Sequence, residues 1–139
     1  MQLKFRRIAG SIGLLLLLLI PNPSQSQSAA SRRVLVEVWA GGDDGLTQRL
    51  KVALEGEFKH SQQFKPSEGK KPHTLIVTIP TNIRWDRDGS RTKVLYSVDF
   101  TSTDGEVFGH SKGSCWDDDL VKCSARIVSD ARLASRKLR

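Results

Sequence analysis

One pair of residue types in this sequence could perform nucleophilic catalysis, the thiol of Cys115 and the imidazole of His110. Cys115 precedes an expected helix, whose positive dipole end favours a thiolate, and His110 lies close by in sequence. No motif supports His110 as a general base, and no serine lies in a G-x-S-x-G elbow. Cys123 is a nearby partner for Cys115. We therefore expect a protein that is not an enzyme.

The remaining candidates for metal or phosphate chemistry also lack the required spacing. The histidines His60, His73 and His110 are scattered, with no H-x-H or H-x3-H pair. Asp117–Asp119 fall in the first turn of an expected helix, where negative charge complements the dipole. The glycine segment 41–45 lies between a strand and a helix, but its two carboxylates would repel a phosphate. We expect no metal, no cofactor, and a helix cap at Asp43 or Asp44.

A cluster of basic and aromatic residues surrounds a predicted hairpin turn at 86–90. Its members are Arg84, Trp85, Arg87, Arg91 and Lys93. Basic and aromatic side chains on a hairpin can bind an anionic polymer. The alternative is a solvated hairpin whose charges prevent edge-to-edge aggregation.

The first residues have the layout of a secretory signal peptide. Lys4, Arg6 and Arg7 precede an uncharged apolar stretch at 8–20, and small polar residues follow Pro23. We predict a leader over 1–26, cleaved after Ser26 or alternatively after Ala30. As a helix the apolar stretch would rise about 20 Å, short of the roughly 30 Å needed to span a bilayer. We expect no transmembrane span after cleavage.

Export changes how the charge and the cysteines are interpreted. Removal of the leader's three basic residues lowers the formal net charge from +7 to +4, so nucleic acid is not an expected partner. In an oxidising compartment two cysteines indicate a disulfide, with two free thiols as the alternative. We predict a Cys115–Cys123 bond and a periplasmic or secreted location.

The 139 residues, of which 38% are hydrophobic and 27% charged, are enough for one folded domain. After a flexible segment at 27–33, β-branched and alternating patterns predict strands over 34–39, 74–87, 93–101 and 106–112. Apolar stripes at helical spacing predict helices over 43–60 and 117–138, and the polar segment 61–72 is expected to be a loop. The fold class is therefore α+β. We expect a single two-layer domain over 34–139, a four-stranded, mainly antiparallel sheet with both helices on one face.

The strand at 93–101 alternates buried and wet positions, and Leu95 is the apolar exception on its wet side. We expect the sheet face opposite the helices to be the contact surface, with Leu95 at its centre and Trp85 joining it.

The element order resembles the small periplasmic domains of the TolB amino-terminal and curli-secretion lipoprotein group. The segments that carry the resemblance are 45–50, opening the first helix, and 98–107 in the strand meander. The chain differs from the lipoprotein members because it has no lipid-acceptor cysteine near the leader. We do not assign its segment from Gly113 to Cys123 to any feature of that group. The resemblance implies an adaptor that acts through protein contacts.

The sequence thus favours a non-enzymatic envelope protein that binds another envelope protein as an adaptor or accessory module. An alternative is a binder of anionic lipid or glycan through the basic hairpin. A second alternative is a small secreted enzyme or inhibitor.

Overall fold

The computed structural model describes residues 32–69 and 71–138. The predicted leader, its cleavage site and all but the last two residues of segment 27–33 lie outside the described residues. Within the described ranges, no helix combines the length and the apolar character needed to cross a membrane.

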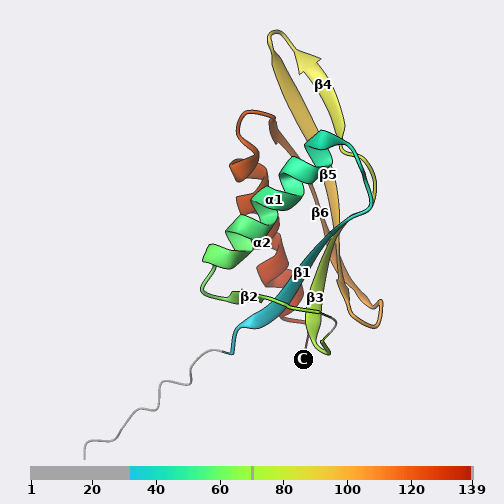
Figure 1. The fold of residues 1–139 in the computed structure, drawn as a ribbon, viewed down its shortest axis with the longest axis vertical. Helices are drawn as coiled ribbons and strands as arrows, with labels where there is room; N and C mark the ends of the chain where they lie inside the picture. Colours follow the sequence, from blue (N-terminus) through green and yellow to red (C-terminus); the bar gives the residue numbers. More distant parts are fainter. Residues whose placement is uncertain (1–31, 70, 139) are drawn as a thin grey trace, which may run out of the picture.

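The fold is α+β, with two helices packed on one face of a six-stranded mixed sheet (Figure 1). The strands are β1 (Val34–Ala40), β2 (Phe64–Pro66), β3 (Thr74–Ile79), β4 (Arg84–Asp88), β5 (Arg91–Ser102) and β6 (Val107–Trp116). The helices are α1 (Gly45–His60) and α2 (Leu120–Ser135). The α+β class and the two layers agree with the sequence-based prediction, but the sheet differs from it.

The strand β5 is the spine of the sheet. Its first half pairs with β4 and its second half with β3, while β6 pairs along its other edge; all three pairings are antiparallel. The strand β1 lies parallel to β3 on one side and to β2 on the other. Since α1 is the crossover between β1 and β3, these two strands must run in the same direction.

The prediction of four strands is wrong in two places. The strand β2 lies inside the segment 61–72 that was expected to be a loop, since three residues ending in Pro66 carry no alternating pattern. Phe64 anchors β2, because its ring packs edge-on against Phe58 with 5.0 Å between centroids. The predicted strand over 74–87 is two strands, because the chain leaves the sheet at Pro80 and rejoins the same edge of β5 as β4.

The end of the chain also differs from the prediction. The strand β6 continues to Trp116 rather than ending near 112, and α2 begins at Leu120. Asp117–Asp119 therefore precede the helix instead of forming its first turn. Asp119 occupies the N-cap position without a side-chain capping bond.

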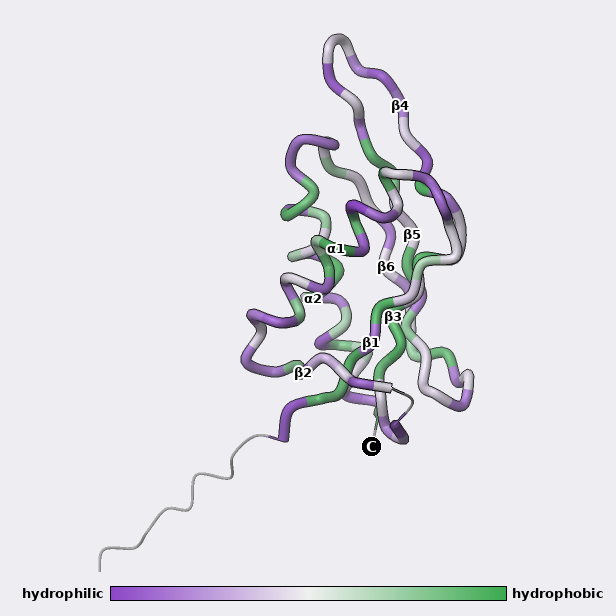
Figure 2. The backbone as a smooth tube through the Cα atoms, viewed as in Figure 1, coloured by the Kyte–Doolittle hydropathy of each residue, from purple (hydrophilic) through white to green (hydrophobic). Residues whose placement is uncertain are grey.

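The core forms where both helices meet the sheet. The predicted stripe of α1 is buried at Leu50, Leu54 and Phe58. In α2 the stripe is buried at Ile127 and Ala131. Val121 is 59% exposed, because its position on α2 lies about a quarter turn away from buried Leu120. Figure 2 shows the hydrophobic residues concentrated on the central strands and inner helix faces, while the tip of the β4–β5 hairpin is hydrophilic.

Candidate functional site

Among the described residues, no helix lies over the sheet face opposite α1 and α2 (Figure 1), and we term this face the open face. Strand register and side-chain alternation place alternate residues of β1, β3, β5 and β6 on it. Its principal members are Leu35, Glu37, Trp39, Ile76, Thr78, Leu95, Ser97, Asp99, Thr101, Val107, His110 and Lys112.

One row of the open face, running from β1 across β3 and β5 to β6, contains the apolar residues Ile76 and Val107. Ile76 is paired with Glu37 on one side and Thr101 on the other, and Thr101 is paired with Val107. Ile76 is only 5% exposed, although it does not belong to the core beneath the helices. Val107 is 57% exposed.

Trp39 begins the neighbouring row and is 44% exposed. Trp39 and Val107 expose apolar surface on either side of Ile76, which is itself buried, and we term these three residues the apolar strip. An indole and a valine of this exposure are costly in water and favourable in a protein interface.

The row that starts at Trp39 continues through Thr78 and Asp99 to His110. The Nδ1 atom of His110 lies 2.6 Å from Oδ1 of Asp99, in a directly opposed cross-strand pair. This pair gives the open face a polar margin beside the apolar strip.

A hollow of about 240 Å³ lies on the open face between the strands and the β5–β6 turn. The turn, drawn in orange in Figure 1, lies on the side of the sheet away from the helices. The hollow is lined by Glu37, Trp39, Ile76, Thr78, Thr101, Ser102, Thr103 and Gly105. A second hollow, of about 360 Å³, lies nearer the hairpin and is lined in part by Arg84, Leu95, Ser97 and Lys112.

The structure separates Trp85 from Leu95, contrary to the expectation that they share one surface. Leu95 is partly buried on the open face and is paired with Arg84. Trp85 is paired with Val94, so its side chain points to the other face, where it is 61% exposed. Successive side chains of a strand point to opposite faces of the sheet, so Trp85 cannot share a face with its neighbour Arg84.

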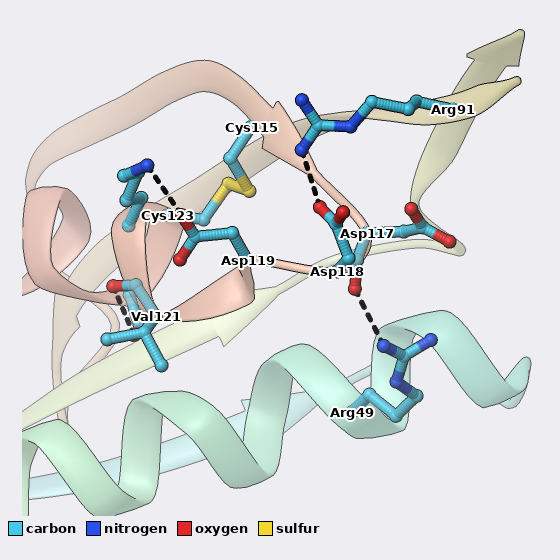
Figure 3. Close-up of a disulfide and its surroundings, with 10 residues drawn as sticks. Arg49, Arg91, Cys115, Asp117, Asp118, Asp119, Val121 and Cys123 are labelled. Atoms are coloured by element: carbon cyan, nitrogen blue, oxygen red, sulfur yellow. Dashed lines mark hydrogen bonds and ion pairs between the residues drawn. A yellow bond between two sulfur atoms is a disulfide. The ribbon is translucent and has the colours of Figure 1, made fainter.

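The basic residues of the hairpin are likewise divided. Arg87 is on the Trp85 side, whereas Lys93 lies on the open face opposite Asp86. Arg91 donates to Asp118 at 2.7 Å (Figure 3). Its guanidinium also stacks over the Trp116 ring, 4.3 Å from the ring centroid. An ion pair with Asp118 therefore neutralises Arg91, and Lys93 has an aspartate directly across from it.

Cys115 and Cys123 form the predicted disulfide, which joins the end of β6 to the first turn of α2 (Figure 3). Cys115 is paired with Val94 and thus faces the core, whereas His110 faces the open side. The structure does not bring the thiol and the imidazole together.

The acidic residues before α2 are each held by a basic side chain (Figure 3). Arg91 binds Asp118, Lys122 binds Asp119 at 2.6 Å, and the Arg49 side chain donates to the Asp117 carbonyl oxygen. These contacts hold the segment between β6 and α2 in place. Among residues 32–69 and 71–138, no group of three potential metal ligands comes together.

The glycine segment between β1 and α1 is closed by protein atoms. The Asn82 side chain accepts from the Asp43 N–H at 2.9 Å, and a Cβ on Gly42 would lie 2.3 Å from the same Asn82 oxygen. Asp44 caps α1 by accepting from the N–H groups of Leu46 and Thr47. The segment is therefore a turn with a helix cap.

Sequence reasoning identified the open face and Leu95, but not Trp39, Ile76 or Val107. The signal that could have located Trp39 is the parity of β1, because Glu37 marks its wet side and Trp39 follows two residues later. Ile76 and Val107 carry no such mark, because each is one apolar residue within an apolar segment.

Comparison with protein-family models and with curated proteins finds no match to the chain.

Proposed function

We propose that this protein is a non-enzymatic binding module of the cell envelope, an adaptor or accessory protein that holds another envelope protein on its open face. The observation that carries the proposal is the apolar strip, on a sheet face that neither α1 nor α2 covers. Tryptophan is strongly enriched among residues that dominate binding energy, and a polar margin around an apolar centre is the usual anatomy of an interface.

Separate observations support a periplasmic or secreted location. The disulfide suits an oxidising compartment, and the predicted leader supplies a route to it. The resemblance to the TolB amino-terminal and curli-secretion group supports the same periplasmic or secreted location and an adaptor role.

The alternative function, binding of anionic lipid or glycan, depends on the β4–β5 hairpin. The hairpin projects beyond the helices in Figure 1, and every residue of β4 is exposed. The cross-strand partners of Lys93 and Arg91 are acidic, however, and the remaining arginines Arg84 and Arg87 point to opposite faces. We therefore place this function second.

Co-purification from the native host tests the proposal. We expect the variant Trp39→Ala/Val107→Ser to lose its co-purifying partner at low and high salt alike, because apolar contacts are little screened. The control Val52→Ser/Val121→Ser changes equally exposed residues on the helices and should retain the partner. Equal recovery of the partner with both variants would contradict the proposal. Loss of the partner in Arg84→Ala/Arg87→Ala, and from the parent protein at high salt, would contradict it too.

A further inference from the structure

The hollow on the open face is lined by Glu37, and one oxygen of the Glu37 carboxylate has no partner. The Oε2 atom of Glu37 is buried and makes no hydrogen bond within the described residues. Glu37 also takes part in none of the ion pairs found there. A buried oxygen of this kind loses its hydration without compensation, which is unfavourable unless a donor arrives from outside.

The surroundings of Glu37 favour a cationic donor. Trp39 lies two residues along the same strand face and lines the same hollow, so its indole offers a π face to a positive charge. The lining includes threonine hydroxyls but no lysine or arginine. The adjoining β5–β6 turn carries Asp104 and Glu106, both exposed, so the local field also favours a cation.

We propose that the hollow receives a lysine or arginine side chain of the protein bound on the open face. The ammonium or guanidinium pairs with Glu37 while the aliphatic stem lies against Trp39 and Ile76. The inference rests on the proposed function, and it adds the chemistry of the partner: a basic residue within an otherwise apolar contact.

The size of the hollow agrees with this occupant. A volume of about 240 Å³ accommodates one extended basic side chain and is below the roughly 300–1,000 Å³ of typical small-molecule sites. An acidic side chain would meet Glu37 with the same charge, and an apolar one would leave the buried oxygen without a donor.

Titration with short peptides, followed by NMR of the tryptophan indole N–H signals, tests the inference. The probes are acetyl-Gly-Lys-Gly-amide and its Arg, Glu and norleucine counterparts, and the Trp39 signal is assigned with Trp39→Phe. We expect saturable shifts of the Trp39 signal with the Lys and Arg peptides only. Glu37→Gln should raise the Kd about fivefold or more, as expected for loss of a charge-assisted hydrogen bond. Glu57→Gln, on α1 and outside the lining of the hollow, should leave the Kd unchanged.

Equal responses to the Lys and norleucine peptides, absence of any shift, or an unchanged Kd in Glu37→Gln would overturn the inference. These outcomes are separate from failure of the proposed function. Loss of the partner in Trp39→Ala/Val107→Ser but full retention in Glu37→Gln would preserve the binding face and reject the cation. Retention in both variants would instead reject the binding face itself.

Discussion

Asp44 shows how one carboxylate fixes the start of α1. Its oxygens accept from the N–H groups of Leu46 and Thr47 and from the Thr47 hydroxyl. The same hydroxyl accepts from the buried N–H of Ile83 at 2.9 Å, so the cap is connected to the segment between β3 and β4. Thr47 has no exposed surface, and these two hydrogen bonds satisfy its hydroxyl inside the core.

These contacts make the cap sensitive to acid. The pKa of Asp44 lies below its ordinary value of 3.8, mainly because the Thr47 hydroxyl donates to the charged form; partial burial acts in the opposite direction. Since the folded-state pKa is lowered, the stabilisation is present above the unfolded value and is lost as pH falls through the folded value.

We therefore expect Asp44→Asn to be less stable than the parent protein at pH 7 by about 0.5 kcal/mol, because asparagine keeps a capping oxygen but removes the negative charge at the helix N-terminus. The difference should shrink as the pH falls below 3.8, the ordinary value of the aspartate. Urea denaturation of both proteins from neutral to acidic pH measures it. A difference that stays constant with pH would show that the charge of Asp44 is not what stabilises the cap.

At the scale of elements, the disulfide defines how α2 follows β6. Cys115 and Cys123 are eight positions apart in the sequence, and Arg91 and Arg49 hold the segment between them. Cys123 is 1% exposed and packs in the core, so the bond ties the first turn of α2 to the sheet.

Replacement of both cysteines by alanine should lower the free energy of unfolding by about 2–3 kcal/mol, the chain-entropy value for so short a loop. The measurement is chemical denaturation with and without dithiothreitol. Reductant should destabilise the parent protein by a similar amount and leave the double variant unchanged. A parent protein whose stability is the same with its thiols reduced would contradict this expectation.

Elements with strong periodicity were predictable from the sequence, and those defined by long-range pairing were not. The stripe of α1 and the alternation of β5 are local patterns, so both appear in the sequence. The strand β2 exists because Phe64 packs on Phe58 and β1 offers a free edge, and neither fact is local.

The same limit applies to Gly113, whose role depends on a neighbouring strand. Tyr96 lies directly opposite it, and a Cβ at Gly113 would be 2.5 Å from the Tyr96 hydroxyl oxygen. Only the register of β5 and β6 reveals this contact.

At the scale of the whole molecule, the two faces of the sheet have different roles. The helix-covered face supplies the core, while the open face keeps Trp39 and Val107 accessible. The sequence predicted which side would be free, because both helices have one apolar stripe each. It could not predict the apolar strip, since its three members come from different strands aligned by register.

Charge is distributed along the open face as well. Around the hollow lie Glu37, Asp104 and Glu106, whereas Arg84 and Lys93 lie toward the hairpin end beside Asp86 and Asp88. A partner bound along this face would therefore meet an acidic end at the hollow and charges of both signs at the hairpin.

Site-specific photo-cross-linking in the native host tests the central claim most directly. A photoreactive residue at Val107 samples the open face, and one at Val52 on α1 samples an equally accessible site on the helix layer. We predict that one envelope protein is cross-linked from position 107 and not from position 52. Cross-linking of the same protein from position 52 alone, or of none from position 107, would contradict the assignment of the open face as the binding surface.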